Sequence, residues 1–268
     1  MHADCWKFRK SDKSIKIGTC VMIHDQPPKL MIICTSRFLQ DRTAFRDCLP
    51  LLTGHRAGNE VRIVSEVNIP GGRVDYFLVS VRDGVIEDFV GIEFQGLDTN
   101  GSVWPERQRF LHQCGVPVPP ADIATRGSFG MNWKMSAKTI LGQLHHKVAT
   151  FDHLGKRFVL VLQDHLLDYL RGEYAFDHIT GHNPADPMQF HVYEMVKAPT
   201  GYQIRIKQRF STDVAGTARC LALKASMEVA MPDMLRAIAR KMPQSTSLSD
   251  TAPLPVPEAP EAEEENES

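Results

Sequence analysis

The most regular pattern of hydrophobic and polar residues in this chain runs from Gly71 to Gln95. Its first half, RVDYFLVSV, is rich in the β-branched and aromatic residues that favour strands. Its second half, DFVGIEFQ, has a similar character, and Asp83-Gly84 between the two halves is a strong signal for a tight turn. The pattern therefore predicts a β-hairpin.

Three polar residues interrupt the apolar surface of this predicted hairpin. Asp75 lies on the first strand, and Glu93 and Gln95 lie two residues apart on the second. Because side chains alternate across a strand, Glu93 and Gln95 should share one face, while Ile92 and Phe94 point to a core on the other. Polar groups buried without partners are costly, so we expect a compensating group beside them, such as a divalent metal ion.

Other segments show helical or extended patterns, separated by a Pro- and Gly-rich connection at 116–130. The predicted strands are 29–36, 60–67, 157–163, 188–196 and 201–211. The predicted helices are 37–49, with Phe38, Phe45 and Leu49 towards the core; one that begins near Trp104; 131–151, with Met135, Ile140, Leu141, Leu144, Val148 and Phe151 buried; 164–170; and 214–242, with a break at Pro232.

Basic residues on these elements are candidates for contact with an anionic partner. The predicted helix 131–151 carries three lysines outside its apolar stripe, namely Lys134, Lys138 and Lys147. Basic residues near Trp133 suit phosphates and bases, although a solvated helix face would account for them equally well. Arg107 follows the loop behind the hairpin, where a substrate contact is plausible on position alone. The last predicted strand adds a row of basic residues, Arg205, Lys207 and Arg209.

The composition is that of an ordinary globular protein, with 43% hydrophobic residues among 268. No apolar run approaches the roughly 20 residues that span a bilayer. The basic N-terminus lacks the apolar core of a signal peptide. We therefore expect a cytoplasmic protein with no membrane partner. In that reducing compartment the six cysteines favour metal binding, catalysis or burial over disulfides.

The net charge of −1 hides an uneven distribution of charged residues. The segment after Pro243 holds seven of the 32 acidic residues and no Lys or Arg, so the rest of the chain carries 31 basic residues against 25 acidic ones. That excess suits an anionic partner without demanding one. The acidic, Pro-rich segment has no aromatic residue, and we expect it to be disordered. The predicted divisions are an N-terminal metal-binding segment, 1–36, a main domain, 37–243, and a tail, 244–268.

Four residues near the N-terminus have the types expected of metal ligands, namely His2, Cys5, Cys20 and Cys34. The first two have the two-residue gap of a metal-binding knuckle, and Gly18 would let backbone amides turn towards sulfur. Such a set suits a tetrahedral zinc or iron ion. Cysteine is also among the most buried residue types, so simple burial is the alternative.

The acids of the predicted hairpin suggest a second metal site. Asp75 and Glu93 could hold Mg²⁺ through carboxylates and water, and the ion would activate water for attack on a phosphodiester. Gln95 can orient a water molecule but carries no charge. Glu66, on the predicted strand 60–67, is either a third acid at this site or a charge on an edge strand. Such a short motif matches many chains by chance, so a purely structural hairpin is the alternative.

Longer runs carry a more specific signal. VDYFLVSV, DFVGIEFQGLDTNGSVWPERQRFL and GMNWKMSAKTILGQLHHKVATF resemble the NotI family of type II restriction endonucleases, from the N-terminal cysteines to about Gln163. The resemblance implies an α/β fold of the PD-(D/E)xK, restriction-endonuclease-like kind, in which a mixed sheet flanked by helices carries the site. It also implies a small N-terminal metal-binding motif, Mg²⁺ dependence and a homodimer that cuts both strands of a palindrome.

The same resemblance implies roles for particular residues. Asp75, Glu93 and Gln95 fall on the family's catalytic positions, where Gln in place of Lys is part of the pattern, and Glu66 falls on a nearby acidic position. The family has a structural iron held by four cysteines. Three of these correspond to Cys5, Cys20 and Cys34, and His2 stands in place of the remaining cysteine.

We therefore predict a sequence-specific, Mg²⁺-dependent endonuclease that cuts double-stranded DNA, with a GC-rich palindrome as the first guess for its site. Its nuclease domain would be 37–243, and a cognate DNA methyltransferase would be its functional partner. Contacts to DNA phosphates would come from Arg107, Lys134, Lys138 and Lys147. The alternatives are a repair or structure-selective nuclease of the same fold and a non-catalytic DNA-binding module.

Overall fold

A mixed β-sheet with helices on both faces forms the centre of the protein. The structure is a computed structural model, and it describes residues 5, 7–9, 12–24, 27–124, 129–199, 201–222 and 231–244. The chain divides into two units, Met1–Lys224 and Ala225–Ser268, and the sheet belongs to the first. Within the described ranges, no helix has the length and apolar character needed to cross a lipid bilayer.

The sheet has six strands in the order β10-β9-β8-β5-β4-β3. The central pairs β5–β8 and β8–β9 are parallel, and the other three pairs are antiparallel. The strands are β3 (Glu60–Ile69), β4 (Gly72–Arg82), β5 (Val85–Gln95), β8 (Arg157–Gln163), β9 (Met188–Ala198) and β10 (Gly201–Thr212). The predicted hairpin is confirmed, because β4 and β5 pair around Asp83 and Gly84, which have the positive φ angles (49° and 79°) that a type I′ turn requires.

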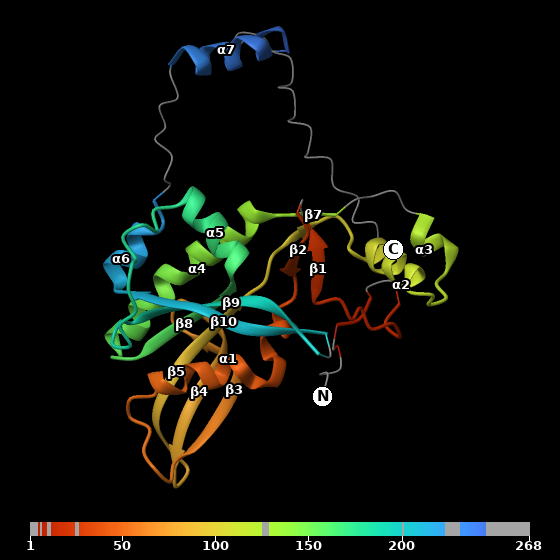
Figure 1. Ribbon diagram of the computed structural model, residues 1–268. Helices are drawn as coiled ribbons and strands as arrows, with labels where there is room; N and C mark the ends of the chain where they lie inside the picture. Colours follow the sequence, from red (N-terminus) through yellow and green to blue (C-terminus); the bar gives the residue numbers. More distant parts are fainter. Residues whose placement is uncertain are drawn as a thin grey trace. The chain divides into compact units, whose positions relative to one another are not determined.

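Two hydrophobic cores cover the two faces of the sheet, with α4 and α5 on one face and α1 on the other (Figure 1). Phe151 and Phe158 are buried in the first core, and Phe38 and Tyr193 in the second. β8 lies between both cores, which accounts for its continuous apolar sequence. The helices of this unit are η1 (Thr35–Arg42), α1 (Thr43–Cys48), η2 (Leu49–Leu51), α2 (Trp104–Gln113), α3 (Pro120–Ala124), α4 (Trp133–His153), α5 (Asp164–Glu173) and α6 (Val214–Arg219). Short strand pairs are β1 (Val21–His24) with β2 (Lys29–Ile32), and β6 (Thr99–Asn100) with β7 (Gly130–Met131).

The β1–β2 ribbon is tied to the end of the central sheet by the side chain of Gln163. Its amide oxygen accepts the backbone N–H of Ile32 at 2.7 Å, and its amide nitrogen donates to the backbone oxygen of Leu30 at 2.5 Å. Gln163 is only 1% exposed, so these bonds satisfy backbone groups that would otherwise lack partners. The bonds hold the chain segment between Cys20 and Cys34 at the end of β8.

The predicted helix 37–49 is interrupted in the structure. Asp41 and Arg42 have left-handed backbones (φ 51° and 56°) and divide the segment into η1 and α1. A single helical period therefore does not run through it. Phe38 and Phe45 are buried as predicted, but Leu49 is 39% exposed.

α4 begins two residues later than predicted. Asn132 caps it, because its side-chain oxygen accepts the backbone N–H of Met135 at 3.2 Å. The first turn is fastened to the loop after β5, since the Ser136 hydroxyl donates to the Asp98 carboxylate at 3.0 Å. Met135 is 51% exposed instead of buried, because it lies nine residues, or two and a half helical turns, before buried Leu144 and therefore on the opposite side of α4. The rest of the predicted stripe with described side chains is buried, namely Ile140, Leu144, Val148 and Phe151.

The basic row on β10 is neutralised by acids from three other elements. The pairs are Arg205 with Glu194 at 2.6 Å, Lys207 with Asp164 at 2.7 Å and Arg209 with Asp47 at 2.9 Å. The prediction that these three residues share one face is wrong, because a β-bulge at Lys207 shifts the register and places Arg209 on the α1 face of the sheet, opposite to Arg205. The structure therefore does not favour this row as a surface for DNA.

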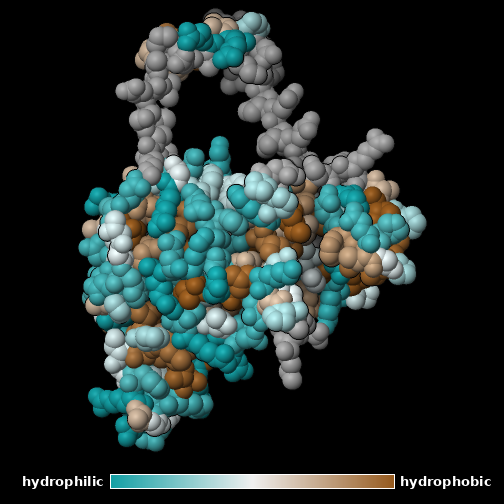
Figure 2. Space-filling model, in the orientation of Figure 1, coloured by the Kyte–Doolittle hydropathy of each residue, from teal (hydrophilic) through white to brown (hydrophobic). Residues whose placement is uncertain are grey.

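The turn end of the hairpin carries hydrophobic residues at the surface. Figure 2 shows a hydrophobic patch at the lower end of the first unit, where Figure 1 draws β3, β4 and β5. The exposed apolar residues of these strands are Ile63, Val64, Val85 and Ile86. β3 is an edge strand of ten residues, and its charged residues Glu60 and Arg62 oppose unwanted pairing with another strand.

The second unit contains α7 (Met231–Lys241) and η3 (Met242–Gln244). Pro232 is the second residue of α7, where a missing backbone N–H costs no helical hydrogen bond. The predicted break in 214–242 thus falls before this proline, and residues 223–230 lie outside the described part of the chain. The disorder predicted for 244–268 concerns residues that, after Gln244, also lie outside it.

Candidate active site

Asp75 and Glu93 lie opposite each other on β4 and β5, where the regular pairing of these strands ends. The pairing reaches Tyr76 and Ile92, so the two acids occupy the next opposed positions. The Asp75 carboxylate accepts the backbone N–H of Phe94 at 2.9 Å. The Asp75 carboxylate thus takes the place of a backbone oxygen as the acceptor for Phe94. This bond keeps Asp75 beside Glu93, near the carboxyl end of β5.

Both acids point to the face of the sheet that α4 covers. Phe77, two residues after Asp75, is part of the core beneath α4. Gly91, two residues before Glu93, lies against Phe151 of α4. Side chains two residues apart share a face. Ile92 and Phe94 are buried in the opposite core, as the alternation predicts.

The two carboxylates repel each other in a partly buried setting. Burial raises the pKa of both acids, and the neighbouring charge of Asp75 raises the pKa of Glu93 further. Lys147 of α4 opposes this effect. Its Nζ donates to Glu93 Oε1 at 2.8 Å, and its charge lowers the pKa of both acids. Among the described residues, Glu93 Oε2 is buried and has no hydrogen-bond partner.

This set of oxygen atoms fits a hard divalent cation. Mg²⁺ is usually held by one or two carboxylates, with water and substrate phosphates in its other positions. In the described ranges, no group of three or more His, Cys, Asp or Glu residues is arranged to hold a metal ion. The protein would accordingly supply Asp75 and Glu93, and the buried, unpartnered Oε2 of Glu93 is the kind of atom that a cation would compensate.

The other two predicted catalytic residues border these acids. Glu66 is the residue of β3 opposite Asp75, but the two do not pair, because Glu66 has a left-handed backbone (φ 57°). Such a conformation costs a non-glycine residue about 1 kcal/mol or more and is often found at functional sites. Its exposed carboxylate lies 3.4 Å from Arg73. Gln95 is half-buried on the Glu93 face, and its side-chain amide donates to the backbone oxygen of Gly96 at 2.7 Å.

The predicted phosphate-contacting residues fall into two groups. Lys134 and Lys138 are exposed on α4 and available to a partner. Lys147 is 2% exposed and ion-paired, so its place does not favour the predicted phosphate contact. Arg107 is half-buried, stacks 5.1 Å from the centre of the Trp104 ring and donates to Gln108 at 2.8 Å.

The inward place of Lys147 was missed from the sequence, although a signal for it exists. Lys147 is three residues after Leu144 and four before Phe151, both of which are buried. This spacing puts it on the buried face of the helix. Lys147 was predicted to lie outside the apolar stripe because its side chain is charged.

The three described cysteines of the predicted N-terminal metal site interact. Cys20 donates a hydrogen bond to Cys34, which lowers the pKa of Cys34 and raises that of Cys20, and the charge of Cys5 raises the pKa of Cys20 as well. The Gly18 backbone N–H donates to the Cys5 sulfur at 3.2 Å, as the position of this glycine predicts. Within the described part of the chain, these cysteines form no group of three or more ligands that could hold a metal ion. His2 lies outside the described residues.

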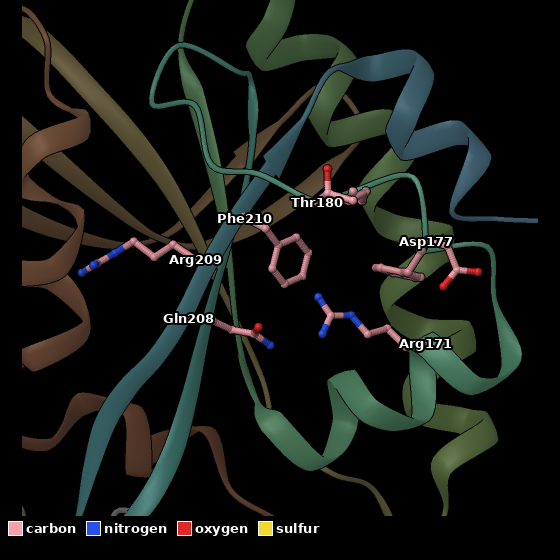
Figure 3. Close-up of a pocket in the computed structure, with 8 residues that line it drawn as sticks. Arg171, Asp177, Thr180, Gln208, Arg209 and Phe210 are labelled. Carbon is pink, nitrogen blue, oxygen red and sulfur yellow. The ribbon is translucent and has the colours of Figure 1, made fainter.

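A separate hollow of about 410 Å³ lies between α5, the following loop and β10. Figure 3 shows that Arg171, Gln208 and Phe210 face it, whereas Arg209 points away. The Arg171 guanidinium lies 5.2 Å from the centre of the Phe210 ring. The hollow includes neither Asp75 nor Glu93, so it is distinct from the carboxylate site.

Two opposed acids at the carboxyl end of a strand, within a mixed α/β sheet flanked by helices, define a candidate site for metal-assisted hydrolysis. The family model described as "Restriction endonuclease NotI" matches residues 9–203 of the chain. The chain belongs to the NotI restriction endonuclease family, whose members are DNA-cleaving hydrolases. No curated protein matches it. The family match contains the predicted catalytic acids and Cys20 and Cys34, while His2 and Cys5 precede it.

Proposed function

We propose that this protein is a sequence-specific type II restriction endonuclease of the PD-(D/E)xK fold that hydrolyses phosphodiester bonds in double-stranded DNA. The observation that carries the proposal is the opposed, partly buried pair Asp75 and Glu93 in a chain of the NotI family. When bound there, Mg²⁺ supplies positive charge to the phosphate and lowers the pKa of the attacking water.

The roles of the protein residues follow from their places. Asp75 and Glu93 would hold the ion, and the Gln95 amide would orient the attacking water from the same face of β5. Lys134 and Lys138 are exposed on the helix that covers these acids, so they are the best placed of the predicted residues for backbone phosphates. Such contacts supply affinity, whereas base-edge contacts supply specificity. Glu66 remains a predicted additional acid.

A homodimer would place one such site on each DNA strand, because a two-fold axis in the protein matches the two-fold axis of a palindrome. A GC-rich palindrome is the proposed target class. A cognate DNA methyltransferase would protect the host's own copies of that sequence.

Incubation of the purified protein with unmethylated plasmid DNA and Mg²⁺ should produce discrete fragments, which agarose gels and sequencing of the fragment ends would reveal. EDTA should stop the reaction, because it removes the divalent cation. A random smear, or no cleavage of several plasmids of high GC content, would contradict the proposal. Cleavage of branched but not linear DNA would instead support a structure-selective nuclease.

We also propose that Cys5, Cys20 and Cys34, with His2 as the fourth ligand, hold a structural iron or zinc ion. Elemental analysis should find about one such ion per chain. Replacement of Cys34 by serine should lower both the metal content and the melting temperature, because the sulfur ligands would no longer be complete. The matched control is Cys220→Ser, which changes a cysteine that is buried like Cys34 but distant in sequence. Metal-free protein with an unchanged melting temperature would remove the site.

A further inference from the structure

Lys147 is a full positive charge inside the protein. Its side chain is 2% exposed and is among the largest fully buried side chains in the described part of the chain. Lysine is almost never fully buried unless it is paired. Its partner is Glu93 at 2.8 Å, and a weaker contact joins its Nζ to Gln143 at 3.4 Å.

Two glycines let α4 approach the sheet closely enough for this pairing. A Cβ atom on Gly91 would lie 2.3 Å from the ring of Phe151, and one on Gly71 would lie 3.2 Å from His146. Either contact is closer than real Cβ atoms comfortably allow. The stem of Lys147 passes over Gly72, whose Cβ would be 3.6 Å from its Cε.

These contacts determine which residues of α4 and β5 meet. Phe151 lies over Gly91, and one helical turn earlier Lys147 lies over Glu93, two residues further along the strand. One helical turn rises about 5.4 Å and two strand residues span about 6.6 Å, so the two spacings nearly match. The close approach at Gly91 thus sets the place of the ammonium group.

The pair leaves the carboxylate only half satisfied. Lys147 bonds to Oε1 of Glu93, while Oε2 is buried without a hydrogen-bond partner among the described residues. A pair that served stability alone would be expected to satisfy both oxygens, because each buried polar atom left alone is costly. One oxygen is held and the other remains available.

We propose that Lys147 is a positioning residue of the cleavage site: it holds Glu93 through Oε1, leaves Oε2 for a divalent cation, and supplies the positive charge that Gln95 lacks. This inference rests on the proposed nuclease function. It moves Lys147 from the DNA-contacting surface to the interior of the site. The positive charge at the site would come from Lys147 of α4 and not from a residue of β5.

The test compares the wild-type protein with Lys147→Met, which keeps the length of the side chain and removes its charge, and with Lys147→Met/Gln95→Lys. The second variant returns a positive charge from a position two residues after Glu93 on the same face of β5. Lys134→Met is the matched control, because Lys134 is exposed on the same helix. Two measurements are made on each: the melting temperature with and without Mg²⁺, and the single-turnover rate of plasmid linearisation at saturating Mg²⁺.

We expect Lys147→Met to melt at a lower temperature without Mg²⁺ and to gain more from Mg²⁺ than the wild type, because the ion replaces the missing charge. Its cleavage rate should fall about 100-fold, with little change in DNA affinity measured by gel shift in Ca²⁺. The double variant should cleave about tenfold faster than Lys147→Met, or more, and its Mg²⁺ response should be close to that of the wild type. Lys134→Met should weaken DNA binding at moderate salt and keep the wild-type Mg²⁺ response.

Equal Mg²⁺ responses in the wild type and Lys147→Met would overturn the inference, as would a reduced rate that Gln95→Lys does not restore. If Lys147→Met alone fails to fold, the double variant decides: its recovery supports the inference, and its failure to fold refutes it. A wild-type protein that cuts no plasmid would instead defeat the proposed function. In that case the Mg²⁺-dependent melting curves alone decide the role of Lys147.

Discussion

Replacement of Asp75 by Asn, or of Glu93 by Gln, should reduce plasmid cleavage about 1,000-fold or more, which corresponds to about 4 kcal/mol of transition-state stabilisation. The amide keeps the shape of the side chain but removes one of the two charges that would hold Mg²⁺. The measurement is the single-turnover rate of plasmid linearisation at saturating protein and Mg²⁺.

The Asp75→Asn variant should remain folded, and this separates a catalytic role from a structural one. Glu93→Gln should be less stable, because it leaves the buried ammonium group of Lys147 without a charged partner. Asn at position 75 keeps an oxygen that can accept the Phe94 N–H. Removing one of two mutually repelling buried charges should leave the melting temperature of Asp75→Asn unchanged or higher in the absence of Mg²⁺. Glu60→Gln is the control, because Glu60 is an exposed acid of the same sheet that pairs with exposed Arg62. An Asp75→Asn protein that cuts DNA at the wild-type rate would remove the proposed site.

The second large effect concerns the attachment of the N-terminal ribbon. Gln163→Leu should reduce the free energy of unfolding by about 2 kcal/mol or more, because the buried N–H of Ile32 and the backbone oxygen of Leu30 lose their partners. Each buried backbone group left unsatisfied costs about 1–3 kcal/mol. Urea unfolding measures the loss.

The ribbon should also become more accessible to protease in this variant, and limited proteolysis with mass spectrometry would locate the first cut near β1 and β2. Gln203→Leu provides the comparison, because Gln203 is an exposed glutamine on β10. If the two variants unfold at the same urea concentration, Gln163 does not hold the ribbon. The outcome also bears on the proposed metal site, since Cys20 and Cys34 flank the ribbon.

Much of the fold could be predicted where the signal is local. The hairpin follows from alternation on both sides of Asp83-Gly84, since a two-residue turn with positive φ suits Asp-Gly and joins adjacent strands. The buried strand β8 follows from an unbroken apolar run. The shared face of Glu93 and Gln95 follows from the period of a strand alone.

Predictions failed where the pattern within one segment does not show where its helix ends, which of its residues face the core, or which partners lie on other elements. Leu49 is exposed because α1 ends at Cys48 and the chain continues as the 3-10 turn η2, so the α-helical period does not extend to it. Met135 is exposed because Ser136, and not Met135, is in line with the buried residues Ile140 and Leu144 at a spacing of four. The basic residues of β10 acquire acidic partners from other elements, none of which its own pattern reveals.

The sequence by itself determined the candidate acids, the strands that carry them and the family resemblance, because all three depend on residue type and short-range order. Only the tertiary structure decided what surrounds the acids. Lys147 reaches Glu93 because α4 packs on Gly91 through Phe151, and Glu93 and Lys147 are 54 residues apart in the chain. Gln163 joins β2 across a still longer separation. Such contacts arise from packing between distant segments, which the spacing within either segment does not record.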